Sequence, residues 1–109
     1  RGIVAYDVLV NQCNMSAVDF MKLVSENPAK LYGMYPKKGT LSIGSDGDIT
    51  IVDKSVEHVL SKESAHTKAD YIPYEGISVT GKVRDVILRG HHVVQDGSLL
   101  ESYLGECIP

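Results

Sequence analysis

The chain has 109 residues, 43% of them hydrophobic, and its 11 basic and 14 acidic residues give a net charge of −3. This length suffices for one small domain with a core, but not for a barrel of eight βα units plus a second domain. The slightly acidic balance gives no electrostatic reason to expect binding to nucleic acid or to an anionic membrane.

The apolar runs, the first residue and the cysteines indicate where the protein is located and whether the chain is complete. No apolar run approaches the ~20 residues of a membrane helix and no secretory signal opens the chain, so we expect a soluble, cytoplasmic protein. The first residue is Arg1 rather than Met, which favours a fragment over a complete gene product. Cys13 and Cys107 are far apart and have no further cysteines beside them, which predicts free thiols.

Two helices are predicted near the start of the chain. An apolar segment within residues 1–13 indicates the remainder of one helix. Ser16, followed by Asp19 three residues later, is a weak capping box and predicts a second helix from Ala17 to Ser25. The apolar residues of this second helix recur at i, i+3, i+4 and i+7 and define one buried face: Ala17, Phe20, Met21 and Val24.

Residues 27–53, NPAKLYGMYPKKGTLSIGSDGDITIVD, mark the change from helical to β structure. Asn27 as N-cap and Pro28 at the first helical position predict a third, short helix, which Gly33 is placed to end. Pro36 then prevents the chain from resuming the helix.

From residue 40 onwards the patterns predict strands and turns. Tight turns are predicted at residues 44–47, at Gly90–His91 and at Asp96–Gly97, and Gly81 is predicted to separate two strands. The predicted strands cover residues 40–43, 49–52, 77–80, 82–89 and 92–95.

The segments between and after these strands are less regular. Residues 53–60 fit either a strand or a loop, whereas the polar residues 61–76 predict a loop for which Tyr71 and Tyr74 would be the packing anchors. The tail retains apolar residues that we expect to pack on a neighbour: Leu99, Leu100, Tyr103, Leu104 and Ile108.

Three stretches of the sequence resemble the cyclic amidohydrolases of the dihydropyrimidinase and hydantoinase type. They are NPAK with YPKKGTLSIGSDGDITIVD, then HTKADYIPYEG, then VILRGHHVVQDG, in the family's order between Asn27 and Gly97. Gly47 departs from the pattern, since the family more often has Ala there. The resemblance implies an α+β fragment with the terminal helices of a metal-dependent (β/α)8 barrel in residues 1–38, part of a small β-sandwich domain in residues 39–97, and a C-terminal tail in residues 98–109.

The same resemblance implies an activity for the whole protein. The whole protein would open a dihydropyrimidine or hydantoin ring to an N-carbamoyl amino acid with a hydroxide held by two divalent ions, usually zinc. The fragment itself would be structural and inactive, and would contact the rest of its own barrel within a homo-oligomer such as a homotetramer. Three alternatives stay open: allantoinase, a non-catalytic dihydropyrimidinase-related protein, and a free-standing β interaction module.

The sequence predicts no catalytic, cofactor-binding or metal-binding residue within the chain. The family's ligand set includes an H-x-H pair, and none is formed by His58, His66, His91 and His92. Adjacent histidines in a strand point to opposite faces, so His91 and His92 would not converge on one ion. Neither cysteine has a histidine nearby in sequence to act as a base.

A consequence for stability follows from the fragment interpretation. The family's small sandwich is completed by strands from before the barrel, so residues 49–52 and 82–89 should leave apolar faces or edges uncovered. We therefore predict that the isolated chain self-associates or is only marginally stable. A monomer with a cooperative melt at high temperature would contradict this prediction.

Overall fold

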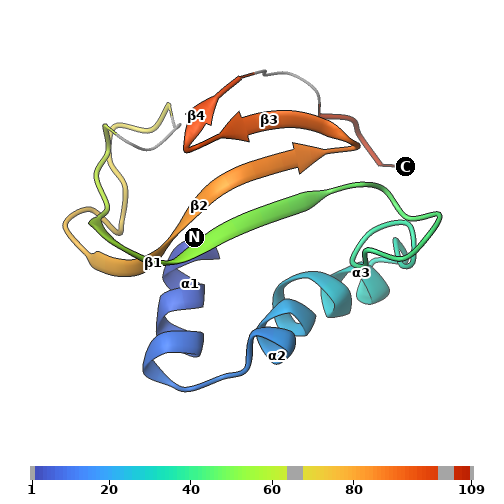
Figure 1. Ribbon diagram of the computed structural model, residues 1–109, viewed down its shortest axis with the longest axis horizontal. Helices are drawn as coiled ribbons and strands as arrows, with labels where there is room; N and C mark the ends of the chain where they lie inside the picture. The colour runs from blue at the N-terminus through green and yellow to red at the C-terminus, as the bar shows by residue number, and fades with distance from the viewer. Residues whose placement is uncertain (1, 64–67, 101–104, 109) are drawn as a thin grey trace.

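A computed structural model describes residues 2–63, 68–100 and 105–108. Within these ranges helical segments come first and a single antiparallel sheet follows, with strand order β1-β2-β3-β4 (Figure 1). The helical segments are α1 (Gly2–Tyr6), the π-helical η1 (Asp7–Gln12), α2 (Ala17–Met21), the π-helical η2 (Lys22–Glu26) and α3 (Asn27–Leu31). The strands are β1 (Ile49–Val59), β2 (Ser78–Leu88), β3 (His91–Gln95) and β4 (Ser98–Leu99). The predicted α+β class is confirmed.

The helix predicted at the start of the chain is present and packs on the sheet. α1 continues without a break into η1, and both contact β2. Tyr6, at the end of α1, is buried, and the edge of its ring meets the ring of Phe20 from α2 at a centroid distance of 5.5 Å. This edge-to-face pair joins the two helical parts of the chain.

The second helix begins where predicted. Ser16 has an extended backbone, with φ −66° and ψ 150°, and its Oγ accepts a hydrogen bond of 3.1 Å from the N–H of Asp19. This bond satisfies one of the amides that the first helical turn leaves without a partner.

The second helix does not end at Ser25, and the prediction of Asn27 as an N-cap is wrong. Asn27 has helical angles, φ −64° and ψ −45°. α2, η2 and α3 therefore form one continuous helix, the long helix, from Ala17 to Leu31. The N–H of Asn27 donates to the carbonyl of Lys22, five residues earlier, which marks a π turn. A widened turn at this point accommodates Pro28, which has no N–H and whose ring crowds the preceding turn of a regular α-helix.

Gly33 ends this helix as predicted. It has φ +71°, and its N–H donates to the carbonyl of Lys30 at 3.2 Å, while the N–H of Met34 donates to that of Ala29 at 2.8 Å. This pair of bonds is the Schellman arrangement, which favours glycine at the left-handed position.

The strand predicted for residues 40–43 is absent, and the turn expected at 44–47 lies two residues earlier. The N–H of Ser45 donates to the carbonyl of Ser42 at 3.0 Å, and Gly44 between them has φ +94°. The side chain of Ile43 is fully exposed. Alternation without a neighbouring strand to pair with is not sufficient to form a strand.

β1 and β2 are both longer than predicted. β1 continues through Val59, so residues 53–59 belong to the strand. Gly81 does not separate two strands but lies inside β2 with φ +120°. A Cβ at Gly81 would lie 3.1 Å from the ring of Tyr6, so glycine is needed there for the close approach of α1.

Two-residue turns connect the last three strands. Arg89 and Gly90 have φ of 47° and 82°, and Asp96 and Gly97 have φ of 50° and 81°. Positive φ at both central residues is typical of type I′ hairpin turns. The first turn was predicted one residue too late, whereas the Asp96–Gly97 turn is confirmed. β4 was not predicted and lies at the start of the range assigned to the tail.

The described residues bury little apolar surface. The buried hydrophobic residues are Tyr6, Ala29 and Val79, whereas several large side chains of the long helix are exposed: Val18, Met21, Leu23, Val24 and Leu31. The proposed anchor Tyr71 is wrong, because it is 70% exposed. Exposed apolar groups on several sides are typical of a helix that packs against further elements. None of the described helices is long and apolar enough to cross a membrane.

The Ser16 cap supports a testable prediction. Replacing Ser16 with Ala removes the acceptor for the N–H of Asp19, so we expect the free energy of unfolding to decrease by about 1 kcal/mol. Ser16→Asp retains an acceptor and should lose much less. Urea unfolding followed by circular dichroism measures both. Equal losses in the two variants would show that the cap does not stabilise this helix.

Candidate functional site

One polar cluster on the sheet is built on a β-bulge in β2. Ile51 lies opposite Asp85 and Val52 lies opposite Val83, so Arg84 is an extra residue in β2. Neighbouring residues of a regular strand point to opposite faces, but a bulge can bring two of them to the same side. The ion pair of 2.6 Å between Arg84 Nε and Asp85 Oδ2 therefore joins adjacent residues.

Asp85 connects β2 to the two strands that follow. Its side chain is buried, and Oδ1 lies 3.1 Å from His92 Nε2 on β3 and accepts a bond of 3.3 Å from the N–H of Asp96 in the turn before β4. The N–H of Gly97 donates to the carbonyl of Arg84 at 2.9 Å. The bulge therefore anchors the turn between β3 and β4 to the middle of the sheet.

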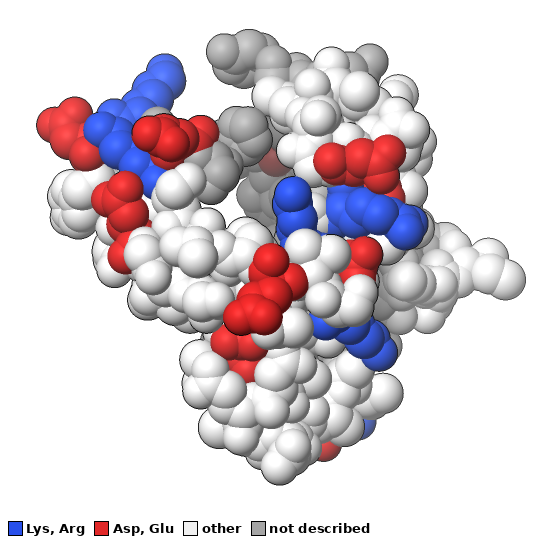
Figure 2. All heavy atoms as spheres, turned by 60° about the vertical axis from the view of Figure 1, so that its left-hand side comes forward, with Lys and Arg blue, Asp and Glu red and all other residues white. Residues whose placement is uncertain are grey.

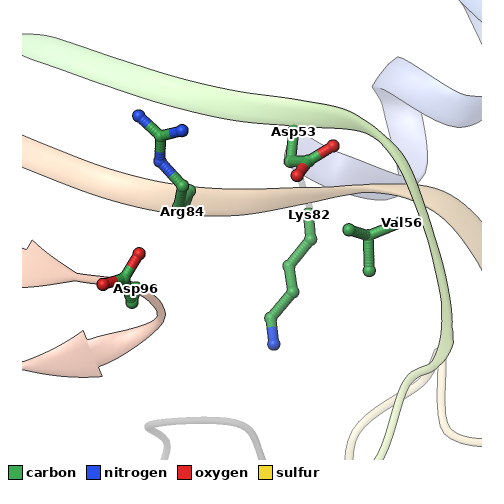
Figure 3. A pocket seen from close by; sticks show the side chains of 5 residues that line it. All are labelled: Asp53, Val56, Lys82, Arg84 and Asp96. Carbon is green, nitrogen blue, oxygen red and sulfur yellow. The ribbon is translucent and has the colours of Figure 1, made fainter.

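A shallow depression of about 250 Å³ lies beside this cluster (Figure 3). Its lining residues come from β1, β2 and the turn before β4: Asp53, Val56, Lys82, Arg84 and Asp96. Arg84 and Lys82 extend in opposite directions in Figure 3, so the two cations do not converge on one point. Basic and acidic side chains are also interspersed on the face shown in Figure 2. This surface has no concentration of one charge that would select a charged ligand.

The Asp85 cluster predicts a dependence of stability on pH. The hydrogen bond from Arg84 is the main cause that lowers the pKa of Asp85; burial opposes it, and His92 and the Asp96 amide add to it. A lowered folded-state pKa stabilises the fold fully above the unfolded value of about 4, and this contribution is lost as the pH falls through the folded-state pKa. We expect Asp85→Asn to reduce the loss of stability between pH 5 and pH 2.5 in urea unfolding.

The exposed Asp70 provides the control for this measurement. Asp70→Asn removes a carboxylate of the same type from the surface, and should leave the pH dependence close to that of the unchanged chain. Superimposable pH profiles for Asp85→Asn and Asp70→Asn would contradict the role of Asp85.

A second ion-pair cluster connects the loop after the long helix to the Arg89–Gly90 turn between β2 and β3. Lys38 Nζ is paired with Asp46 at 2.8 Å and also with Asp48. Asp48 Oδ1 accepts a bond of 2.9 Å from the N–H of Arg89. Burial raises the pKa of Asp48, but the bonds from Lys38 and Arg89 outweigh it and lower the pKa overall. This cluster fixes the point at which the chain enters β1.

Asp7 and Asn11 of η1 bind the backbone of Thr80 in β2. Asp7 Oδ1 accepts from the N–H of Thr80 at 3.1 Å, and Asn11 Nδ2 donates to the carbonyl of Thr80 at 2.8 Å. Asn11 Nδ2 and Gln12 Nε2 also donate to the Asp7 carboxylate, at 2.8 and 3.1 Å. β3 pairs only with residues 86–88 of β2, so these side chains take the place of a neighbouring strand at Thr80.

The sequence analysis missed both buried aspartates. Asp7 lies within IVAYDVLV and Asp85 within VRDVIL, so each is a carboxylate inside an apolar run. That position is the available signal, because a buried carboxylate requires hydrogen-bond partners. Both aspartates join elements of the fold, and neither belongs to a group of three potential metal ligands in the described chain.

The histidines and cysteines do not form a metal or catalytic site in the described residues. His58 is on β1, His91 and His92 are on β3, and His66 lies outside the described residues. No group of three His, Cys, Asp or Glu side chains in the described ranges could hold a metal ion. Cys13 and Cys107 are both exposed and free, as predicted.

Comparison with known proteins shows the family. Residues 2–93 match the Amidohydrolase family, and the chain belongs to it. The chain is 42% identical over 97 residues to the D-hydantoinase of Ralstonia pickettii, a match covering 89% of this chain and 20% of that protein. It is 48% identical over 77 residues to the D-hydantoinase of Geobacillus stearothermophilus, covering 71% and 16%. The resemblance to hydantoinase-type amidohydrolases is confirmed.

Solved structures agree with the sequence relatives. The D-hydantoinase (dihydropyrimidinase) from Thermus sp. superposes with a TM-score of 0.89 at 30% identity, covering 94% of this chain and 22% of that one. The dihydropyrimidinase from Brevibacillus agri gives a TM-score of 0.87 at 37% identity, covering 92% and 22%. The chain therefore spans about a fifth of the length of these relatives, and its described fold is one that they contain.

Proposed function

We propose that this chain is the C-terminal part of a cyclic amidohydrolase that opens a hydantoin or dihydropyrimidine ring to an N-carbamoyl amino acid. The observation that carries the proposal is the match of nearly the whole chain to hydantoinases and a dihydropyrimidinase in both sequence and structure. The small cyclic amide would be the substrate of the whole protein, and the proposed setting is the cytoplasm.

In this proposal the chain has an architectural role. Residues 1–38 would be the last helices of the catalytic barrel, residues 39–97 part of a small β-sandwich domain, and residues 98–109 the tail. The exposed apolar side chains of the long helix, including Val18 and Leu31, support a contact with the rest of the barrel. Homo-oligomerisation, for example to a homotetramer, is part of the proposal for the whole protein.

The metal centre belongs to the rest of the protein. The proposal includes two divalent ions, zinc in the first instance, which would activate water for attack on the ring carbonyl. The described residues do not fit such a centre: His92 is engaged with Asp85, and the described part holds no group of three potential ligands. We therefore assign no catalytic step to residues of this chain.

Metal content and activity test the proposal. Elemental analysis and hydrolysis of dihydrouracil and hydantoin would be measured on this chain and on the full-length product of its gene. We expect about two metal ions and turnover only in the full-length protein. Metal without turnover of either compound, but with turnover of allantoin, would favour an allantoinase. Absence of metal and turnover in both would overturn the proposal and favour a non-catalytic relative or an interaction module.

A further inference from the structure

Two aspartate–glycine pairs occur in the chain, Asp46–Gly47 and Asp96–Gly97. In such a pair the backbone nitrogen of glycine can attack the aspartate side chain and close a succinimide ring, because glycine has no Cβ to hinder the approach. A nitrogen whose N–H donates a hydrogen bond must first give up that bond. The bonds that hold each glycine N–H and each carboxylate therefore decide which pair reacts.

The N–H of Gly97 is engaged in the turn between β3 and β4. It donates to the carbonyl of Arg84 at 2.9 Å, and the N–H of Asp96 donates to Asp85 Oδ1. Attack by the Gly97 nitrogen would break the first of these bonds, which slows the reaction by about fivefold for a hydrogen bond of ordinary strength. Gly97 also has φ +81°, so the hairpin turn requires glycine there.

The N–H of Gly47 is not restrained in this way. Gly47 is the central residue of a γ-turn in which the N–H of Asp48 donates to the carbonyl of Asp46 at 2.9 Å. That turn does not use the N–H of Gly47, and no group in the described ranges accepts a hydrogen bond from it. The backbone nitrogen of Gly47 is thus available to attack the side chain of Asp46.

The Asp46 carboxylate is held by an ion pair that it can leave at little cost. Asp46 pairs with Lys38 Nζ at 2.8 Å, and both side chains are partly exposed, so the pair contributes little. Lys38 is also paired with Asp48, and its ammonium keeps that partner when Asp46 turns away. Asp96 is more exposed, but the hydrogen bond of Gly97 opposes its reaction. The fold therefore favours reaction at Asp46.

The backbone at residue 47 does not require glycine. The φ of Gly47 is not positive, and a Cβ there would lie 3.4 Å from the backbone nitrogen of Gly90, an ordinary contact. Alanine, the residue more common in the family at this position, would fit, and its methyl group would hinder the attack. Glycine at this position thus opens Asp46 to a reaction that alanine would suppress.

We propose that Asp46–Gly47 is a site of isoaspartate formation in this protein. The Gly47 nitrogen attacks Cγ of the protonated Asp46 carboxyl, the new C–N bond forms, and one water leaves to give the succinimide. One water then opens the ring. Cleavage between the nitrogen and Cγ restores aspartate, whereas cleavage between the nitrogen and the main-chain carbonyl carbon gives isoaspartate. No oxidant or reductant takes part, and this chemistry does not depend on the proposed function.

Isomerisation would disturb the point at which the chain enters β1. The main chain of isoaspartate runs through Cβ and Cγ and is longer by one carbon. Asp48 follows two residues later, where it pairs with Lys38 and accepts the N–H of Arg89. The longer main chain displaces Asp48 from these partners.

Isoaspartate mapping on the full-length protein tests the site. The folded protein would be kept at neutral pH and physiological temperature for several weeks, digested at mildly acidic pH, and its peptides separated and labelled with an isoaspartate methyltransferase. We expect at least about fivefold more isoaspartate at residue 46 than at residue 96. In guanidinium chloride, without the fold, the two sites should react at similar rates. As much isoaspartate at residue 96 as at residue 46 in the folded protein, or none at residue 46, would overturn the inference.

Gly47→Ala and Asp46→Glu are the matched variants. Gly47→Ala keeps the carboxylate and hinders the attack, whereas Asp46→Glu keeps an acid for Lys38 but can close only a larger ring, which forms more slowly. We expect neither variant to give more isomerised peptide around residue 46 than around residue 96, and the isoaspartate at residue 96 to be unchanged, which also reports that the fold is intact. Undiminished isoaspartate at residue 46 in Gly47→Ala would overturn the inference.

Discussion

Gly39→Ala is expected to decrease the free energy of unfolding by about 3 kcal/mol. Gly39 lies where the loop after the long helix folds back onto that helix, and a Cβ there would lie 2.6 Å from the Cβ of Ala29 and 3.2 Å from the carbonyl oxygen of Ser25. Gly39 also has φ +85°, which L-residues rarely adopt. Overpacking costs about 1–3 kcal/mol and the backbone strain about 1 kcal/mol more.

Gly76→Ala separates these two costs. Gly76 has the same φ of +85°, but no described atom lies within 4 Å of the position that a Cβ would occupy there. We expect this control to lose only the backbone contribution of about 1 kcal/mol. Urea unfolding of both variants in the same protein gives the comparison. Similar losses would show that the contact between Gly39 and Ala29 is loose enough to accept a methyl group.

Short-range signals predicted the local features well. Ser16, Gly33 and the Asp96–Gly97 turn occur where the sequence placed them, because caps and hairpin turns are decided by a few adjacent residues and their backbone angles. The same reasoning failed at Asn27. Asn27 and Pro28 are both typical of a helix start, but here they lie inside a continuous helix. A π turn changes the hydrogen-bond register of the backbone and leaves no distinct mark on the apolar pattern.

Features that depend on distant residues could not be predicted. Gly81 was expected to interrupt a strand, whereas its role is to admit the ring of Tyr6 from α1. The ion pair of Arg84 with Asp85 requires a bulge, whose position is set by pairing with β1. No catalytic or metal-binding residue was predicted in this chain, for a different reason. The resemblance implies that the metal ligands lie outside this chain, and the described residues contain no alternative group of three potential ligands.

Asp7→Ala is expected to have the other large effect, because it removes the carboxylate that binds η1 to the N–H of Thr80 in the sheet. The Asp7 carboxylate accepts bonds from Asn11, Gln12 and the N–H of Thr80, and its side chain is buried. Alanine leaves the N–H of Thr80 without its acceptor, and an unsatisfied buried donor destabilises more than an absent pair. We expect Tm to fall by about 5–10 °C for a chain of this size.

Asp7→Asn distinguishes the loss of the acceptor from the loss of charge. The Oδ1 of the asparagine can still accept a hydrogen bond from the N–H of Thr80, but its NH2 group would face the NH2 group of Gln12. We therefore expect Tm to lie between that of the unchanged chain and that of Asp7→Ala. The bonds from Asn11 and Thr80 lower the pKa of Asp7, so the difference between Asp7→Ala and the unchanged chain should shrink below about pH 4, as the native carboxylate is protonated. Thermal melts at pH 7 and pH 3 measure this. A difference that stays the same at both pH values would mean that packing around Tyr6, and not the Asp7 carboxylate, holds the helices on β2.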